Sequence, residues 1–155
     1  MPKKSAGILF YRFQANALEI LLVHPGGPFW TKKDLGVWSI PKGEIEEKEI
    51  PLEAAIREVF EEIGVGAGSN FIELTPIKQK GGKIVYAWAA EGNFDVAEIK
   101  SNKFEMEWPP KSGIKKEFPE IDKAEWFGID KAKTKIIESQ TTWIDELKNI
   151  LNAER

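Results

Sequence analysis

The pattern of apolar and polar stretches along the chain predicts two β-hairpins. Residues 6–13 and 18–24 are rich in aliphatic and aromatic side chains, and a polar turn separates them. Residues 71–80 and 83–90 repeat this arrangement on either side of a Gly-Gly pair. Apolar runs bounded by turn-forming residues are typical of paired strands, and paired glycines favour tight hairpin turns. These segments therefore predict a sheet with antiparallel neighbours.

The segment from Ile50 to Ile63 has a helical period instead. Its apolar residues recur three and four positions apart and share one face: Leu52, Ala55, Ile56, Val59 and Ile63. Pro51 suits the first helical turn, where a backbone donor has no partner, and Gly64 suits the left-handed position just past the end. We therefore expect one helix from Ile50 to Ile63, packed on a core through this face.

The connecting segments give a mixture of signals. Residues 38–40 and 124–127 are apolar and predict short strands, while Pro41-Lys42-Gly43 predicts a turn that leads into the helical segment. Residues 25–36 are predicted to form a long loop. The stretch from 94 to 119 shows no clear period, so no element is assigned to it.

The end of the chain predicts helices. Residues 130–137 and 141–152 have the pattern of one or two helices. The second range carries an apolar stripe formed by Trp143, Leu147, Ile150 and Leu151. We expect this stripe to pack in the core, so that helices and strands both contribute to an α/β fold.

Composition limits the class of protein. A length of 155 residues with 42% hydrophobic content can bury a substantial core, and we expect residues 1–155 to form a single domain. The net charge of −3 argues against binding of an extended nucleic-acid backbone, although small polyphosphates bind wherever local cations set the field. The sequence shows no signal peptide and no apolar run of membrane length, so we expect a cytoplasmic protein without a membrane partner.

An acidic cluster on the expected helix is the main candidate for chemistry. Glu58, Glu61 and Glu62 fall within an arc of about 100°, where like charges repel unless a cation lies among them. Arg57 is four residues before Glu61 and can orient that carboxylate. Carboxylate oxygens suit Mg²⁺ or Mn²⁺. The sequence has no Cys and only His24 as histidine, which makes a zinc-type site improbable.

The stretch from Gly43 to Val65 resembles the signature of the Nudix hydrolase family, G-x5-E-x7-R-E-U-x-E-E-x-G-U, where U is aliphatic. The matching residues are Gly43, Glu49, Arg57, Glu58, Val59, Glu61, Glu62, Gly64 and Val65. From ordinary residue frequencies, a chance match would occur in about one in 10⁸ windows or fewer. The order of the flanking elements extends the resemblance over most of the chain. It implies an α/β/α sandwich with a mixed β-sheet.

The resemblance also implies a reaction. Nudix hydrolases cleave a nucleoside diphosphate linked to another moiety, with Mg²⁺ or Mn²⁺ at the phosphates. By position in the signature, Glu58 and Glu62 are the first candidates for metal ligands, and Glu61 is a ligand or a base. The carbonyl of Lys42 or Gly43 is a further ligand candidate. Two signature residues, Glu49 and Gly64, are expected to support the geometry of the site.

The general base is open at this point. The family places it either in the signature helix, where Glu61 is the candidate, or on a downstream loop. Glu105 and Glu107 are the downstream candidates in this chain, unless that segment is a surface loop without a catalytic part. Glu117 and Glu120 are weaker candidates.

Substrate binding must come from residues outside the signature. Phe29 and Trp30 in the 25–36 loop are candidates for base stacking, and Lys32 and Lys33 are candidates for phosphate contacts. The alternative is an ordinary flexible loop. Lys42, just before the catalytic segment, is expected to touch phosphate, whereas Lys83, beside the later hairpin turn, is read as a solvated charge. His24 is read as structural.

The substrate itself stays open. Some dinucleoside polyphosphate hydrolases of this family have a tyrosine, and some ADP-ribose hydrolases a proline, shortly after the signature, where this chain has Lys80-Gly81-Gly82. We favour hydrolysis of a nucleoside triphosphate or a dinucleoside polyphosphate as a small-molecule phosphoanhydride substrate. The alternative is a noncatalytic nucleotide-binding or regulatory module with the same fold. The sequence gives no oligomeric state.

Overall fold

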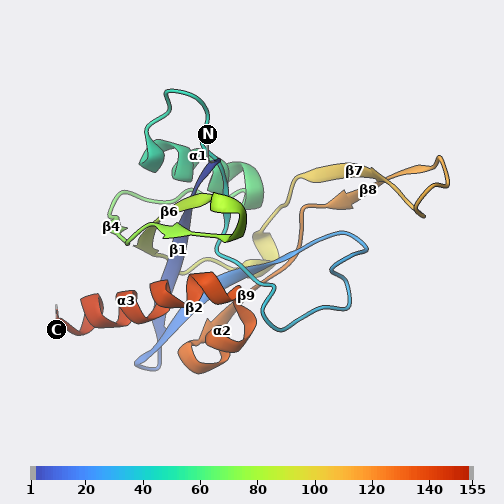
Figure 1. The fold of residues 1–155 in the computed structure, drawn as a ribbon. Helices are drawn as coiled ribbons and strands as arrows, with labels where there is room; N and C mark the ends of the chain where they lie inside the picture. The colour runs from blue at the N-terminus through green and yellow to red at the C-terminus, as the bar shows by residue number, and fades with distance from the viewer. Residues whose placement is uncertain (1–2, 154–155) are drawn as a thin grey trace.

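A computed structural model describes residues 3–153 and places a mixed β-sheet between two helical layers (Figure 1). The strands of this sheet are β1 (Lys4–Gln14), β2 (Ala17–Pro25), β3 (Lys42–Glu44), β4 (Ile72–Glu73), β5 (Ile77–Lys78), β6 (Ile84–Glu91) and β9 (Ile121–Gly128). The α-helices are α1 (Pro51–Ile63), α2 (Ile129–Lys135) and α3 (Thr141–Ala153). Single 3₁₀ turns are η1 (Lys80–Gly82), η2 (Val96–Glu98) and η3 (Glu138–Gln140).

Strand β1 is the centre of the sheet. It runs parallel to β6 along one edge and antiparallel to β2 and β3 along the other. Its first half, Ser5–Gly7, pairs with β3, whereas Tyr11–Gln14 pair with β2. Strands β2 and β3 therefore share one edge of β1 at different heights, and the sheet splits between them. This split positions the site described below.

The segment before α1 differs from the prediction of a short strand at residues 38–40 and a turn at residues 41–43. Trp38 and Ser39 form isolated bridges to Ile136 and Val23, not a full strand. Lys42 and Gly43 then belong to β3, which pairs with β1. The prediction of a turn was wrong because glycine next to proline signals a bend, while the partner strand that keeps this backbone extended lies far away in sequence.

Alternation along β1 explains the two cores of the sandwich. Ala6, Ile8 and Phe10 face α1, while Leu9 and Tyr11 face the opposite layer. The buried residues of α1 are Ala54, Ala55, Val59 and Ile63, and those of α2 and α3 are Ala132, Trp143, Ile144 and Leu147. The predicted α/β/α sandwich with a mixed sheet is confirmed.

The ends of α1 match the prediction closely. Pro51 occupies the first helical turn, and Ile50 just before it is extended. Gly64 has φ 73°, and its N–H donates to the oxygen of Phe60 at 2.8 Å. A glycine is favoured at this left-handed position, so the helix ends where the sequence predicts.

The predicted hairpins are also present, with one interruption. β1 and β2 meet across the turn between Gln14 and Ala17, and β5 pairs with β6 across η1. The predicted strand at 71–80 is divided into β4 and β5, with Thr75-Pro76 between them. Proline lacks the N–H that a continuous strand would require.

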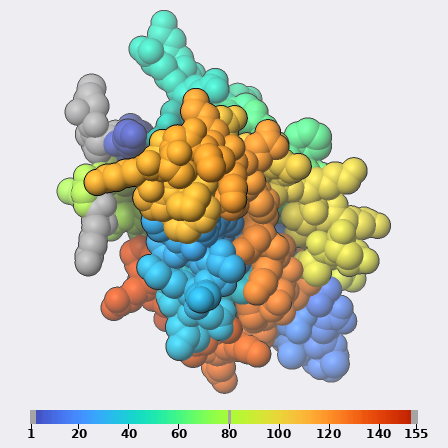
Figure 2. Space-filling view, turned by 90° about the vertical axis from the view of Figure 1, so that its right-hand side faces the viewer, coloured from blue at the N-terminus to red at the C-terminus, as the bar shows by residue number. Residues whose placement is uncertain are grey.

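The segment without an assigned period contains a second, two-stranded sheet. β7 (Lys103–Glu107) and β8 (Lys115–Pro119) form an antiparallel hairpin that projects from the body of the molecule (Figure 1). Residues 25–36, here called the aromatic loop, lie beside this hairpin (Figure 2). The rings of Phe29 and Trp108 are 5.5 Å apart, and Gly27 packs on Phe104. The loop and the hairpin thus support each other.

None of the helices in residues 3–153 combines the length and the apolar character that crossing a bilayer requires.

Candidate functional site

Arg57 organises the carboxylates between β3 and α1. Its Nε and one terminal nitrogen donate to the two oxygens of Glu49 at 2.7 and 2.8 Å, a bidentate pair. The other terminal nitrogen donates to Glu58 at 2.8 Å and to Glu61 at 3.0 Å. The guanidinium also donates to the oxygen of Glu44 at 3.2 Å. One arginine therefore fixes three signature carboxylates and the strand before the helix.

Glu49 belongs to the support of the site. The hydrogen bonds from Arg57, together with one from the backbone N–H of Glu46 at 3.0 Å, lower the pKa of Glu49 to about 2. Glu49 is therefore ionised at neutral pH, and both of its oxygens are occupied by the protein.

Glu58 lies against Gly43 across the gap between α1 and β3. One of its oxygens accepts from Arg57, and the other occupies the space where a Cβ on residue 43 would stand. Burial raises the pKa of Glu58 despite the hydrogen bond from Arg57. The glycine is needed for close approach of a carboxylate, and its backbone lies in an ordinary strand.

Glu62 is the most deeply embedded carboxylate of the cluster. It accepts a hydrogen bond from the backbone N–H of Lys42 at 3.2 Å. Burial raises the pKa of Glu62 to about 8, and the negative charges of Glu120 and Glu58 add to this effect. A desolvated carboxylate beside other carboxylates has a strong electrostatic demand for a cation.

Lys42 lies next to this carboxylate, and Lys83 lies next to Lys42. Burial and the nearby charge of Lys83 lower the pKa of Lys42, and the two ammonium groups are within hydrogen-bonding reach. Lys42 is on β3 and Lys83 precedes β6. Two ammonium groups close together form a site for anionic oxygens. The position of Lys83 in the sequence does not indicate such a site.

A cleft of about 260 Å³ opens where β2 and β3 diverge. Its lining combines both chemistries of the site: Glu62 and Lys42 from the signature region, Trp30 from the aromatic loop, and Glu120 from the turn between β8 and β9. Apolar walls come from Val23, Val37, Ile40, Ile121 and Ile137. An aromatic ring, a lysine and two carboxylates therefore share one cavity.

The four candidate residues of the aromatic loop lie in different surroundings. Trp30 lines the cleft, and the ammonium of Lys33 lies 5.0 Å from the centre of its ring. Phe29, which is 57% exposed, packs on Trp108 of the hairpin instead. Lys32 is exposed. The structure brings Trp30 to the carboxylates more directly than its three neighbours.

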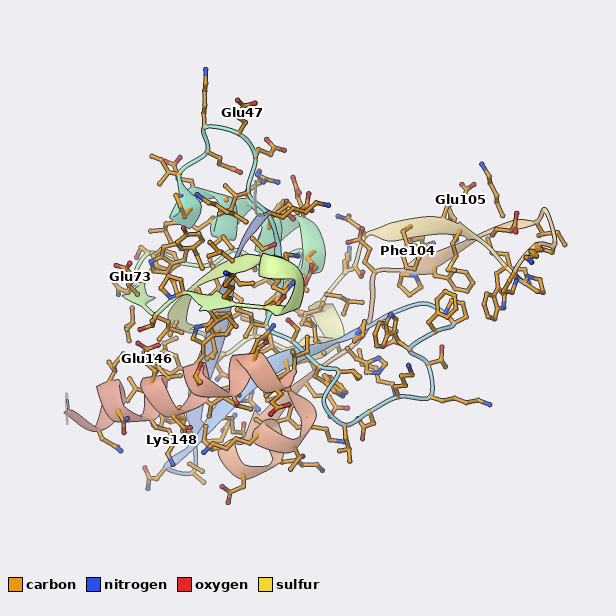
Figure 3. The ribbon with its side chains drawn as sticks, in the orientation of Figure 1. Glu47, Glu73, Phe104, Glu105, Glu146 and Lys148 are labelled. Atoms are coloured by element: carbon orange, nitrogen blue, oxygen red, sulfur yellow. The ribbon has the colours of Figure 1, made fainter. Side chains whose placement is uncertain are left out.

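The candidates for the general base lie in three places. Glu61 is exposed on α1 and bonded to Arg57. Glu105 and Glu107 share one face of β7, and Figure 3 shows Glu105 on the side away from the aromatic loop. Phe104, on the opposite face, packs on Gly27. Glu120 lines the cleft, so the structure favours it over the other downstream carboxylates.

The residues at the site fit a hard divalent cation. Among residues 3–153, no three carboxylate or histidine side chains are already assembled around one point. The oxygen donors are nevertheless at hand, because Glu58 fills the space left by Gly43 and Glu62 is desolvated nearby. Oxygen-only donors with room for water and phosphate suit Mg²⁺ or Mn²⁺.

Three residues make contacts in the structure that their local sequence did not predict. Glu120 was a weak candidate, Lys83 a solvated charge, and His24 a structural residue without a partner in sequence. All three depend on contacts between distant segments: Glu120 with Glu62, Lys83 with Lys42, and His24 with Asp122 at 2.6 Å. No local pattern signals such pairs.

Comparisons with known proteins agree with this architecture. The family model described as NUDIX domain matches residues 1–147. A C. elegans Ap4A hydrolase in a binary complex superposes with a TM-score of 0.68 at 22% identity, covering 97% of this chain and 98% of that chain. The NUDIX domain of Shewanella oneidensis NrtR, complexed with ADP ribose, has a TM-score of 0.68 at 15% identity, with coverage of 97% and 89%. A MutT protein from Methanosarcina mazei Go1 has a TM-score of 0.62 at 18% identity, with coverage of 96% and 94%. At these identities the solved structures show a shared fold.

Proposed function

The chain belongs to the NUDIX domain family and is a Nudix pyrophosphohydrolase, and from this premise we propose that it hydrolyses a phosphoanhydride bond in a nucleoside triphosphate or a dinucleoside polyphosphate. The observation that carries the proposal is the cleft in which Glu62, Lys42 and Trp30 meet. These three side chains supply negative charge, positive charge and a stacking surface within one cavity. We further propose that the 155 residues act as one domain.

Nudix hydrolases generally use divalent metals, and here Glu58 and Glu62 would hold Mg²⁺ or Mn²⁺ with the carbonyl of Gly43 or Lys42. Glu61 is the next candidate on the same helix. When bound, such an ion neutralises phosphate charge and lowers the pKa of an attacking water. Arg57 orients Glu58 and Glu61 through hydrogen bonds of 2.8 and 3.0 Å, so the position of these oxygens depends on it.

Lys42 and Lys83 bind the phosphate chain in this proposal. The side chain of Lys42 lines the cleft with Glu62, and the ammonium of Lys83 is close to that of Lys42. A cationic pair favours a substrate with several consecutive phosphates over one with a single phosphate, because each added negative charge is attracted by both lysines. This supports the preference for triphosphates and dinucleoside polyphosphates.

Trp30 provides the surface on which the base stacks. Its ring is 39% exposed and lines the cleft, with Lys33 beside it for an outer phosphate. Phe29 and Lys32 stand further out on the loop and contribute less. Stacking of this kind tolerates different bases, so the proposal fixes a class of substrate and not one nucleotide.

Glu120 and Glu61 are the proposed bases for the attacking water. Glu120 reaches the cleft from outside the signature helix, and Glu61 is held by Arg57 within it. Glu105 and Glu107 are the remaining candidates. A general base must approach the water within hydrogen-bonding distance, which favours a residue that lines the cleft.

A turnover assay tests the proposal. The protein is incubated with Mg²⁺ or Mn²⁺ and a panel of ATP, diadenosine tetraphosphate, ADP-ribose and a nucleotide sugar, and the products are separated. We expect hydrolysis by the wild type and losses of at least about 100-fold in Glu61→Gln and Glu62→Gln. Glu53→Gln on the first turn of α1 is the matched control and should stay active. Binding of nucleotides without turnover would instead support the noncatalytic alternative.

A further inference from the structure

His24 is the single histidine of the sequence, and it is buried at the end of β2 with 2% of its surface exposed. Its ring packs edge-on against Trp38, with centroids 5.1 Å apart. Nδ1 lies 2.6 Å from Oδ1 of Asp122 on β9, and Nε2 lies 2.6 Å from the backbone oxygen of Lys33. The ring therefore joins the sheet to the aromatic loop through both nitrogens.

The two partners of His24 determine how many protons its ring must carry. The backbone oxygen of Lys33 can only accept a hydrogen bond, so Nε2 carries a hydrogen. The carboxylate of Asp122 is also an acceptor, so both contacts are hydrogen bonds only when Nδ1 donates as well, as in an imidazolium paired with a carboxylate. A neutral imidazole has one N–H and could donate to only one of them. The positive charge is what allows both contacts at once.

The contact with Lys33 bears directly on Trp30. The N–H of Lys33 donates to the oxygen of Trp30 at 2.9 Å, which closes a turn between the two residues. The ammonium of Lys33 lies over the ring of Trp30. His24 thus holds Lys33, the last residue of the turn that begins at Trp30, and the indole of Trp30 lines the cleft.

Other contacts hold the ends of the aromatic loop. The hydroxyl of Thr31 donates to the oxygen of Gly27 at 3.0 Å on the side of β2. On the other side, Asp34 accepts from the indole N–H of Trp38 at 2.9 Å and from Lys135. These contacts keep the loop in place overall, so a change at His24 would alter the turn at Trp30 without releasing the whole segment.

The charged groups around His24 come from three elements. Asp122 and Lys123 belong to β9, Lys33 and Asp34 to the aromatic loop, and Lys135 to α2. Asp34 is engaged by Lys135. Asp122 is therefore the direct charged partner of the ring.

We infer that His24 is a positioning residue that holds Trp30 over the cleft through its contacts with Asp122 and Lys33. This inference rests on the proposed function, because it requires Trp30 to contact the substrate. When the side chain at position 24 cannot bridge Asp122 and Lys33, the turn at Trp30 loosens, and substrate affinity falls more than the rate of the bound complex.

The first test needs no substrate. Because the sequence has one histidine, ¹⁵N NMR of the wild type reports on the His24 ring alone, and Trp30→Phe assigns the indole signal of Trp30. We expect the ring signals to show hydrogen bonds at both nitrogens, and the Trp30 indole signal to shift in His24→Gln. Ring nitrogens without these hydrogen bonds, or an indole signal that is the same in the wild type and His24→Gln, would overturn the inference.

The second test is kinetic and uses diadenosine tetraphosphate with Mg²⁺. The KM of His24→Gln should exceed that of the wild type by about 5- to 10-fold with little change in kcat, because one amide nitrogen replaces two ring nitrogens. In a Trp30→Ala background the effect of His24→Gln on KM should fall below about 2-fold, because the two residues act in series. Equal KM values for wild type and His24→Gln, or additive effects in the double variant, would contradict the inference.

Asp122→Asn provides a variant that leaves the ring in place, in case His24→Gln does not fold. Without the carboxylate the ring loses its charge-assisted partner, so the Trp30 indole signal should shift as expected for His24→Gln. An unchanged signal would count against the pairing. If no compound is hydrolysed by the wild type, the proposed function fails while the NMR experiment still decides the role of His24.

Discussion

One carboxylate oxygen of Glu58 occupies the space in which residue 43 would place a Cβ. A glycine at this point is therefore a condition for seating the carboxylate between α1 and β3. Any side chain here would push Glu58 away from Arg57, with which it forms a hydrogen bond of 2.8 Å.

Gly43→Ala should abolish most activity while the protein stays folded. The added methyl displaces Glu58, and we expect kcat/KM to fall at least about 100-fold, since small displacements of catalytic groups have effects of this size. Activity and thermal unfolding are measured together. Gly66→Ala is the matched control, because nothing lies within 4 Å of a Cβ there. Equal activity of the two variants would show that Glu58 need not occupy this space.

Arg57→Lys should lower kcat about 10- to 100-fold, although the charge is kept. A lysine cannot make the bidentate contact with Glu49 and also reach Glu58 and Glu61. Steady-state kinetics at saturating metal measure the effect. Arg12→Lys, on the surface next to Glu19 and Trp126, serves as control and should leave kcat unchanged. A wild-type kcat in Arg57→Lys would mean that charge alone suffices.

Glu49→Gln should destabilise the protein in a pH-dependent manner. The pKa of Glu49 is lowered from 4.5 to about 2, mainly by hydrogen bonds from Arg57. Its ionised form therefore stabilises the folded state fully above pH 4.5, and this contribution is lost as the pH falls toward 2. Urea midpoints of the wild type and variant should differ most near neutral pH and converge in acid. A difference that is constant with pH would exclude this origin.

Glu62→Gln should have the opposite pH dependence in metal-free protein. Burial raises the pKa of Glu62 from 4.5 to about 8, so ionisation destabilises the folded wild type as the pH rises through this range. In EDTA we expect the variant to be more stable by at least about 1 kcal/mol above pH 8, since one pKa unit corresponds to about 1.4 kcal/mol. Added Mn²⁺ should raise the unfolding temperature of the wild type more than that of the variant. A variant that is less stable in EDTA would refute the assignment.

Three of the four downstream carboxylates can be separated by matched substitutions. Glu120 lines the cleft, whereas Glu105 and Glu107 extend from β7. We expect Glu120→Gln to reduce kcat by about 10²-fold or more, and Glu105→Gln and Glu107→Gln to change it by less than about 3-fold. Single-turnover measurements report the chemical step. A large loss of kcat in either β7 variant would indicate that the general base lies on the hairpin.

Local patterns predicted the parts of the molecule that depend on neighbours in sequence. Helix α1 ends at Ile63 because Gly64 adopts φ 73°, and the first hairpin turns where Gln14 pairs with Ala17. Of the predicted stripe, Trp143 and Leu147 are buried, and Ile150 and Leu151 pack against the same core while partly buried. In these cases the glycine, turn and apolar spacing are themselves the physical cause.

Features that depend on distant partners were not predictable in this way. The hairpin of β7 and β8 lacks a buried face of its own and takes its support from contacts such as Trp108 with Phe29. Lys42 is extended because β1 pairs with it, although its neighbours signal a turn. The same holds for the site. The signature predicted the cluster around Arg57, whereas the cleft forms only when distant segments come together in the fold.

The split of the sheet between β2 and β3 has a consequence for how such a protein can diversify. The proposed metal ligands lie on α1 and β3 and the proposed base Glu120 follows β8, while Trp30, the proposed stacking surface, comes from residues 25–36. Each set has its own anchoring contacts. Exchanging residues 25–36 should therefore retarget the enzyme to new compounds, with the proposed metal ligands and base carried over intact.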